Sequence, residues 1–189
     1  GPMARNVADA AMLLDVMAGY DSRDPMSLDN PAESFEEATA QQRVPPRIAF
    51  SPDLGVTPVD PEVAQICEQA AKRFEELGAH VEEAHPDFSG LQEVFQVHRA
   101  LSYGTSLGPE LEANREVFKP EIVWNVEKGL GLTGQEIMDA MVARSEIYQR
   151  ANKFFSTYDL VLTPSTVVPP YPVEQRFVER VGDHEFSNY

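Results

Sequence analysis

The 189-residue sequence is poor in cysteine, in basic residues and in long hydrophobic runs. Its single cysteine excludes an internal disulfide and is typical of a reducing compartment. No apolar run approaches the ~20 residues of a membrane-spanning helix and no signal-peptide pattern is present, so we expect a cytoplasmic protein without a membrane partner. The 15 basic residues are outnumbered by 31 acidic ones; the net charge of -16 argues against nucleic-acid binding through a basic patch.

The sequence also lacks the short motifs of several enzyme classes. It has no Gly-rich phosphate loop and no Gly-x-Ser-x-Gly nucleophile elbow. His80 and His85 lie near acidic residues but without metal-site spacing, and a solvent-exposed sheet edge explains them better. Cys67 lies among apolar residues of a predicted helix, which favours core packing over catalysis. We therefore expect no metal, no cofactor and no complete catalytic constellation in these residues.

The best-defined part of the chain is the unit formed by residues 47–84. Residues 47–50 predict a strand, and Asp60 followed by Pro61 is a typical helix start. Gly78 ends this helix, and residues 79–84 predict a second strand, which pairs with the first in parallel. The helix has one apolar stripe, made of Val63, Ile66, Cys67, Ala70, Phe74 and Leu77.

Helical patterns also flank this unit. Asn6 caps a first helix that ends at Gly19, and residues 20–46 are predicted to be a loop or linker because prolines prevent long helices there. The buried stripe of the first helix is predicted to be Val7, Ala10, Ala11, Leu14 and Met17.

Three more helices are predicted after the central unit. One begins at Leu91, and Gly104 and the Gly108-Pro109 pair are expected to break it, leaving a second short piece that ends near Phe118. The next helix opens at Pro120, and a capping-box pattern at residues 133–136 opens the last one. The inward side of that long helix is predicted to carry Ile137, Met141, Tyr148, Ala151 and Phe155.

A third buried strand is predicted at residues 160–162, and hydroxyl groups follow it at Thr163, Ser165 and Thr166. Ligands in open α/β sheets tend to bind at such carboxyl ends of strands. Residues 173–189 are predicted to be a polar tail without a terminal strand.

These elements predict an α/β fold with part of a mixed, mainly parallel sheet flanked by helices. Two or three parallel strands form a poor sheet on their own, and the helices carry more apolar surface than such a sheet covers. We therefore expect residues 1–189 to be one partial domain, without a separate second domain, that is completed by further polypeptide or by a second copy in a homodimer.

Four stretches, in order, resemble the amidase signature family of hydrolases. Residues 1–10 are similar to its Gly-Pro-Met-Ala-Arg-Thr-Val-Ala-Asp-Ala segment, with Asn6 in place of the usual Thr or Ser. Residues 21–25, Asp-Ser-Arg-Asp-Pro, resemble the loop that follows, and residues 47–55 resemble the next strand and loop. Residues 158–164 resemble the late strand that ends in Thr-Pro. The resemblance implies the internal or C-terminal part of an amidase-signature domain.

The resemblance also implies hydrolysis of a small-molecule carboxamide to a carboxylic acid and ammonia or an amine. In the family a serine is activated through a second serine, on a cis peptide, by a neutral lysine, and these residues precede the segment resembled by residues 1–10. This sequence has no Ser-Ser pair and no Gly-Gly-Ser, so no catalytic residue is assigned here and the chain alone is expected to be inactive. By resemblance it supplies a wall of the substrate funnel, with Tyr103, Trp124, Thr163, Ser165 and Thr166 as candidate substrate-binding residues.

Two alternatives remain open from the sequence. The chain could belong to the A-type subunit of a tRNA-dependent amidotransferase, which shares the scaffold, although the acidic balance disfavours direct contact with nucleic acid. It could also be a non-catalytic interaction module that binds a partner through exposed helix faces.

Overall fold

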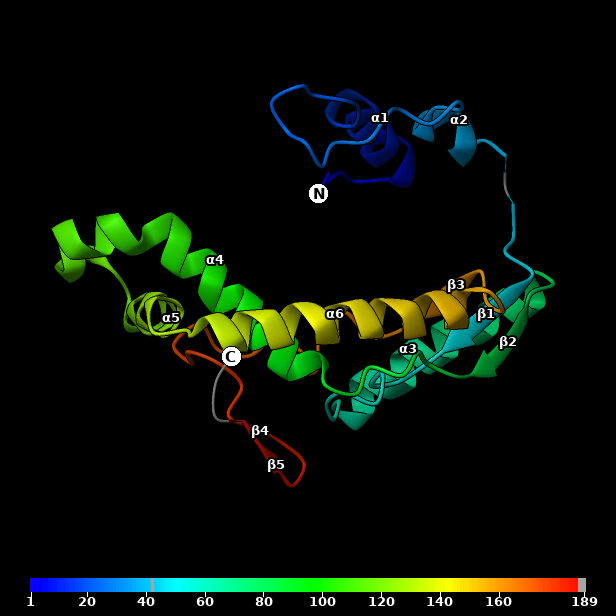
Figure 1. Cartoon of the computed structure of the whole chain (residues 1–189). Helices are drawn as coiled ribbons and strands as arrows, with labels where there is room; N and C mark the ends of the chain where they lie inside the picture. The colour runs from blue at the N-terminus through cyan, green and yellow to red at the C-terminus, as the bar shows by residue number, and fades with distance from the viewer. Residues whose placement is uncertain (42, 187–189) are drawn as a thin grey trace. The chain divides into compact units, whose positions relative to one another are not determined.

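The computed structural model describes residues 1–41 and 43–186, which fall into two compact units, Gly1–Val44 and Pro45–Tyr189. Figure 1 labels the helices and strands of both units along the chain. Within the described residues, no helix combines the length and the apolar character needed to cross a membrane.

The first unit contains helices α1 (Val7–Met17) and α2 (Phe35–Thr39). Asn6 caps α1 as predicted, because its side chain accepts a hydrogen bond of 2.8 Å from the backbone N–H of Asp9. The Asp15 carboxylate in α1 accepts hydrogen bonds of 2.8 and 3.0 Å from the first backbone N–H groups of α2, which joins the two helices. The range expected to be a loop therefore includes one short helix, and its capping box of Ser34 and Glu37 is the local signal for it.

The stripe predicted for α1 was only partly correct. Ala11 is buried, but Val7 and Met17 are 73% and 59% exposed. The physical reason is that apolar residues occur on every side of α1, since Leu13 and Val16 are exposed as well. Such a helix is typical of the interior of a larger domain.

The second unit is built on a three-stranded parallel sheet of β1 (Arg47–Phe50), β2 (His80–Glu83) and β3 (Leu160–Leu162). The strand order is β2-β1-β3, so β1 is central, and Ile48 and Ala49 are completely buried. Helix α3 (Pro61–Glu76) connects β1 to β2, with Asp60 as its cap. The predicted α/β fold with a parallel sheet flanked by helices is confirmed.

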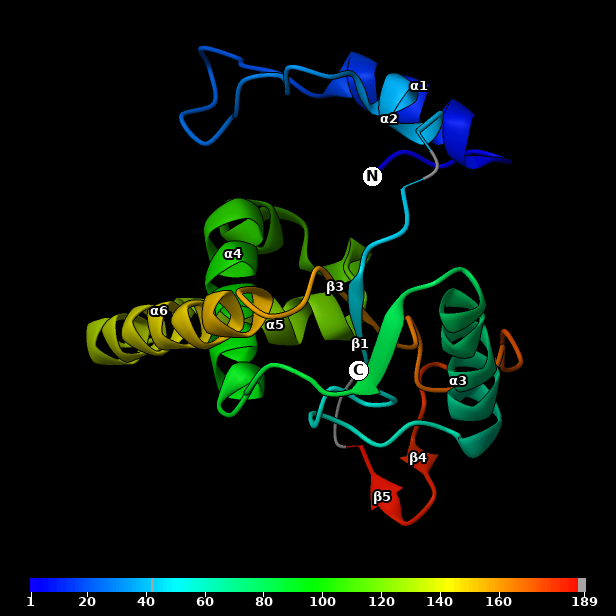
Figure 2. The same ribbon diagram turned by 90° about the vertical axis from the view of Figure 1, so that its right-hand side faces the viewer.

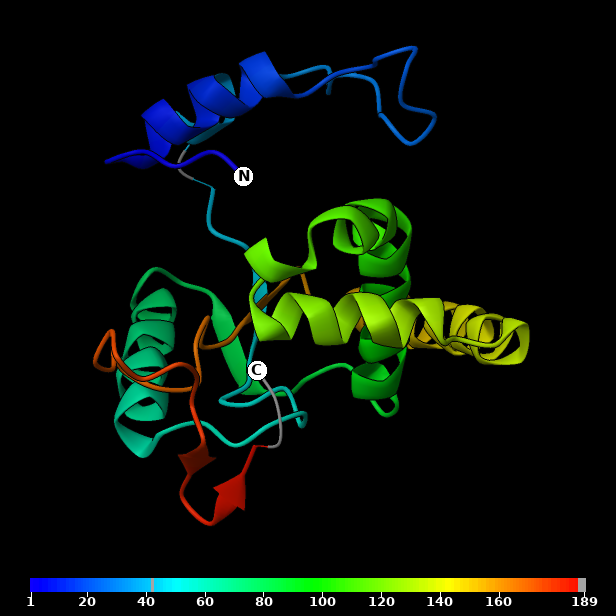
Figure 3. The same ribbon diagram turned by 90° about the vertical axis from the view of Figure 1, so that its left-hand side faces the viewer.

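Helices cover both faces of this sheet. Figures 2 and 3 show α3 on one side and α4 (Leu91–Asn114), α5 (Pro120–Leu130) and α6 (Gly134–Phe155) on the other. A short 3₁₀ turn, Arg115–Val117, joins α4 to α5. The sheet is thus the middle layer of the unit, as parallel strands require.

The predicted break in the helix that begins at Leu91 was wrong, because α4 runs without interruption through Gly104, Gly108 and Pro109. A Cβ atom on Gly104 would lie 3.0 Å from the backbone carbon of Gly129 in α5, so here the glycine serves a close helix crossing. Pro109 removes one backbone N–H donor from α4, and packing of α4 against α5 outweighs that loss.

The inward faces of α3 and α6 also differ from the predictions. In α6 the buried side chains are Ala140 and Ile147, whereas Met141, Tyr148 and Phe155 of the predicted stripe are 57%, 70% and 46% exposed. In α3 the buried residue is Ala71, whereas Ile66 and Leu77, the residue that follows the helix, are exposed. These helices carry more apolar surface than the neighbouring elements cover. The face that becomes buried therefore depends on where the neighbouring element lies, and not on the helix sequence alone.

Residues 173–189 were expected to contain no terminal strand, which was wrong. The structure places an antiparallel hairpin there, with β4 (Arg180–Val181) paired to β5 (His184–Glu185). Gly182 between the strands has a φ of 56°, a conformation that glycine adopts without strain. Val181 is buried, so the hairpin has an inner side.

Candidate functional site

The carboxyl ends of the parallel strands are tied together by hydrogen bonds from the segments that follow them. The backbone N–H of Ser51, just after β1, donates to the carbonyl of Leu162 in β3 at 2.9 Å. The backbone N–H of Asp60 donates to the carbonyl of Val167 at 2.8 Å, so the loop before α3 is joined to the segment after β3. These bonds hold the loops beyond the strand ends in defined positions.

A hollow of about 590 Å³ lies among these loops, and we call it the strand-end hollow. Its lining comes from the loop after β1, the start of α4, the segment after β3 and the β4–β5 hairpin. This volume is within the usual range of ~300–1,000 Å³ for small-molecule sites. The lining residues are Val56, Thr57, Gln92, Val167, Tyr171, Phe177, Val178, His184, Glu185 and Phe186.

The polar groups of the strand-end hollow are few and mostly engaged. Glu185 forms an ion pair with Arg180, and the rings of His184 and Phe186 pack edge to face with centroids 4.7 Å apart. The hydroxyl of Thr57 is buried without a hydrogen-bond partner among the described residues. The lining contains neither serine nor lysine, so it can bind a group but does not itself supply serine–lysine chemistry.

The structure places the five predicted site residues in three separate regions. Thr163, Ser165 and Thr166 follow β3 at the strand ends, where the Thr166 hydroxyl donates to the carbonyl of Val168 at 3.2 Å. Tyr103 in α4 and Trp124 in α5 each line a different hollow. The other three residues line neither of these two hollows, and the part of all five in substrate binding stays a prediction.

The hollow beside Tyr103 is small and charged. Its volume is about 410 Å³, and its other lining residues are Lys119, Glu121, Ile122 and Arg176. Arg176 forms an ion pair with Glu121, and hydrogen bonding to this guanidinium lowers the pKa of the Glu121 carboxyl below its ordinary value. This hollow suits a polar or charged group.

The hollow beside Trp124 is formed by α5 and the turn before it. It has a volume of about 560 Å³ and includes Arg115 and Glu127, which form an ion pair of 2.6 Å. The Lys128 ammonium lies 5.0 Å from the centroid of the Trp124 ring, a cation–π geometry. Trp124 is 42% exposed, so an indole face remains accessible in the described chain.

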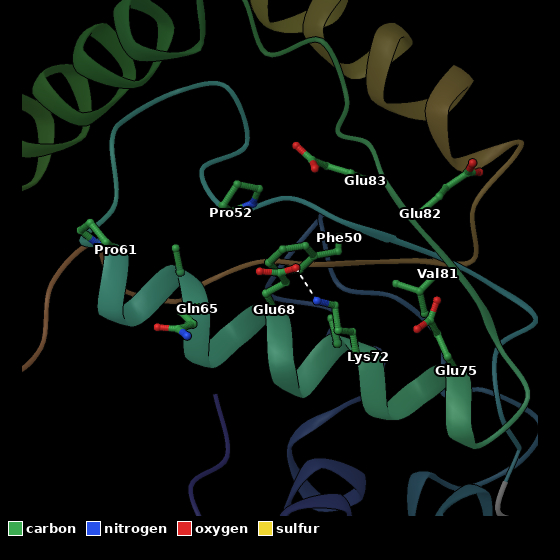
Figure 4. Close-up of a pocket in the computed structure, with 12 residues that line it drawn as sticks. Phe50, Pro52, Pro61, Gln65, Glu68, Lys72, Glu75, Val81, Glu82 and Glu83 are labelled. Atoms are coloured by element: carbon green, nitrogen blue, oxygen red, sulfur yellow. Dashed lines mark ion pairs between the residues drawn. The ribbon is translucent and has the colours of Figure 1, made fainter.

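A fourth hollow, of about 470 Å³, lies between α3 and the sheet (Figure 4). In the figure Val81 points toward α3 and Glu82 away from it, as strand alternation requires. Lys72 of α3 is paired to Glu68 at 2.6 Å, and this hydrogen bond raises the pKa of the lysine. Lys72 is therefore held in the protonated form, the opposite of what a lysine base needs.

The histidines near acidic residues have local structural partners. The His85 ring bonds the carbonyl of Pro86 at 2.9 Å and packs on Gly55, where a Cβ atom would lie 2.6 Å from the ring. His80 lies 3.7 Å from Glu82 on the exposed edge strand. Among residues 1–41 and 43–186, no three His, Cys, Asp or Glu side chains are grouped closely enough to hold a metal ion.

Sequence reasoning identified the strand ends but missed most of the lining. Val56 and Thr57 follow the end of β1, and the strand-end rule that selected Thr163 applies to them equally. Tyr171, Phe177 and Phe186 come from the stretch at or next to the expected tail, and no local signal shows that it folds back over the strand ends.

Comparison with known proteins gives consistent matches over most of the chain. A family model described as Amidase matches residues 1–187. The chain is 32% identical over 180 residues to the acylamidase of Rhodococcus erythropolis, covering 93% of this chain and 37% of that protein. It is 26% identical over 201 residues to the A-type subunit of the glutamyl-tRNA(Gln) amidotransferase of Trichlorobacter lovleyi, covering 93% of this chain and 41% of that protein. The chain thus spans about two fifths of the length of these relatives.

Solved structures show the same fold. A bacterial aryl acylamidase of the amidase signature family superposes with a TM-score of 0.82 at 22% identity, covering 97% of this chain and 40% of that one. The 6-aminohexanoate cyclic dimer hydrolase superposes with a TM-score of 0.67 at 17% identity, covering 82% of this chain and 34% of that one.

Proposed function

Because this chain belongs to the amidase family, we propose that it is part of a cytoplasmic enzyme that hydrolyses a carboxamide C–N bond to a carboxylic acid and ammonia or an amine. The match to the Amidase model along nearly the whole chain is the observation that carries this proposal. The relative with 32% identity is named an acylamidase, which supports an N-acyl amide as the substrate.

We propose further that the reactive groups lie on polypeptide outside residues 1–189. The sequence contains no Ser-Ser pair and no Gly-Gly-Ser, the pattern expected around the family's two serines. None of its four lysines, all in the described part of the chain, is buried, whereas a neutral lysine base requires removal from solvent. The part played by this chain is to bind and orient the amide beside the reacting serine.

The serine oxygen attacks the amide carbon, its proton passes through the second serine to the lysine, and backbone amides stabilise the oxyanion. The C–N bond then breaks as the lysine returns this proton to the departing nitrogen, and water cleaves the acyl-serine to release the carboxylic acid. The loops at the carboxyl ends of β1 and β3 position the groups attached to the amide, so they govern specificity more than the rate of bond cleavage.

The test compares the polypeptide of the full reading frame with residues 1–189 alone. Both are assayed for ammonia or amine release from a panel of primary amides and anilides. We expect turnover by the full polypeptide and none by the 189 residues. Activity of the 189 residues alone would overturn the placement of the triad, and inactivity of both on every amide would overturn the hydrolase proposal.

A second candidate is the A-type subunit of a tRNA-dependent amidotransferase. It is favoured by relatives of that kind that match at 24–29% identity, below the 32% of the acylamidase. Such a protein would co-purify with a tRNA-binding partner and transfer ammonia from glutamine to an aminoacyl-tRNA. A homodimer is the corresponding expectation for a free-standing amidase, and the mass of the purified complex separates the two.

A further inference from the structure

We propose that the strand-end hollow binds an uncharged apolar group attached to the amide, an aryl ring or a branched alkyl chain. This inference rests on the proposed amide hydrolysis and assigns the part of the substrate that these residues receive. It differs from the prediction made from sequence, in which Tyr103 and Trp124 were the aromatic contacts.

The position of the hollow is the first argument. It lies beyond the carboxyl ends of β1 and β3, and Gln92 brings the start of α4 to it. Open α/β sheets bind their ligands at this edge because the connecting loops diverge there and leave a crevice. The hollows beside Tyr103 and Trp124 lie instead along α4 and α5.

The chemistry of the walls is the second argument. Aromatic or branched apolar side chains make up most of the lining, and it includes neither lysine nor arginine. Its one carboxylate, Glu185, is paired with Arg180. An anionic substituent would find no cation here, whereas an apolar group would gain contact with Val56, Val167 and Tyr171.

The comparison with the charged hollow strengthens the assignment. The hollow beside Tyr103 presents Lys119, Glu121 and Arg176 within about 410 Å³, so desolvation of these charges opposes an apolar occupant. The strand-end hollow is larger, at about 590 Å³, and its lining has only one charged group, the Glu185 carboxylate, so this cost is smaller there. An uncharged ring therefore fits the strand-end hollow better than the charged one.

Backbone hydrogen bonds and a buried side chain support the walls. The Asp60 to Val167 backbone hydrogen bond of 2.8 Å holds the two loops together. The backbone N–H of Phe186 donates to Glu179 at 2.9 Å and closes the hairpin, whose Val181 is buried. A preformed wall loses little conformational entropy on binding, which favours discrimination between substrates by shape.

The test uses the full-reading-frame enzyme and three amides: acetamide, acetanilide and benzamide. Relative to acetamide, acetanilide carries a phenyl ring on the amide nitrogen, and benzamide carries one on the acyl side in place of the methyl group. Val56→Phe narrows the hollow, because Val56 is 40% exposed and lines it. Val173→Phe makes the same change at a residue that is 92% exposed and outside the lining, so it is the matched control.

We expect Val56→Phe to lower, by about tenfold, the ratio of kcat/KM for the preferred aryl amide to kcat/KM for acetamide, as expected when a ring is excluded from a pocket. Tyr171→Ala, which removes a wall, should lower the same ratio, and Val173→Phe should keep the wild-type ratio. An unchanged ratio in Val56→Phe, or an equal loss for both amides, would overturn the assignment. A lower unfolding midpoint for Val56→Phe with an unchanged kcat/KM ratio would also overturn the assignment, because other residues of the protein would then fill the hollow.

Failure of the hydrolase proposal gives a different result. If the wild type hydrolyses no amide of the full panel, these three included, the proposed function is refuted and acetanilide becomes a stable probe. Titration calorimetry then compares its binding to the wild type, Val56→Phe and Val173→Phe. Weaker binding to Val56→Phe alone supports the hollow as a site for an apolar group, and equal binding to all three overturns it.

Discussion

The crossing of α4 and α5 gives the sharpest stability prediction. A Cβ atom on Gly129 would lie 1.9 Å from the carbonyl oxygen of Ala100 and 2.7 Å from its carbon. Both of these atoms belong to the backbone of α4, so no side-chain rotation relieves the overlap. Gly129→Ala therefore forces the two helices apart, which also loosens Ala100 and Val126, both completely buried.

The magnitude follows from two opposing effects. Replacing glycine by alanine inside a helix stabilises it by about 1 kcal/mol. Overpacking a core costs about 1–3 kcal/mol, and the backbone contact here puts Gly129→Ala at the upper end. We expect a net destabilisation of about 2 kcal/mol.

Gly108→Ala is the matched control in the same pair of helices. Its added Cβ atom would lie 3.5 Å from Leu130 Cδ2, an ordinary van der Waals contact. Only the higher helix propensity of alanine then acts, and we expect Gly108→Ala to raise the free energy of unfolding by up to about 1 kcal/mol. The two variants should thus differ by about 3 kcal/mol.

The assay is urea unfolding of the full-reading-frame protein, followed by far-UV circular dichroism at equilibrium. The expected order of midpoints is Gly108→Ala, then wild type, then Gly129→Ala. Equal midpoints for the two variants would refute the close backbone contact between α4 and α5. A Gly129→Ala midpoint above that of the wild type would refute it more strongly.

Two further predictions concern the ends of the sheet unit. Asp60→Ala removes the 2.9 Å hydrogen bond from the Glu62 backbone N–H that caps α3, and should lower the free energy of unfolding by about 1 kcal/mol. Asp60→Asn should keep most of the stability, because asparagine also caps helices. Equal urea midpoints for Asp60→Ala and the wild type would contradict the cap. Hydrogen bonding from Tyr158 lowers the pKa of Glu82 below its ordinary 4.5, so this contact stabilises the fold above pH 4.5 and is lost as the pH falls through the lowered pKa. The thermal midpoint of the wild type should therefore be higher than that of Tyr158→Phe at pH 7, and this difference should shrink toward pH 3. A difference that does not change with pH would contradict the contact.

The sheet unit was predictable because its signals are local. Asp60 and Pro61 mark the start of α3, Gly78 follows its end, and β1 is a short apolar run. The amidase family was predictable in the same way, since its segments are contiguous and occur in order.

Two of the wrong predictions share one cause, which is that the sequence does not show which residue packs against another. Gly104 was interpreted as a helix breaker because the sequence does not show that Gly129 packs on it. The inward face of α6 was placed on Met141 and Tyr148, whereas the buried residues of α6, a helix that packs on α4, are Ala140 and Ile147. The β4–β5 hairpin is different, because Gly182 followed by Asp183 is itself a local hairpin signal.

The walls of the strand-end hollow lie beyond the last hydrogen bonds of the sheet. Ile48 and Ala49 of the central strand make no part of those walls, and the hairpin that contributes His184 and Phe186 packs through its own buried Val181. The scaffold and the recognition surface are thus separable. Natural variation can lengthen, shorten or resurface these loops, and so retune which molecules are accepted, while the packed centre of the domain stays as it is.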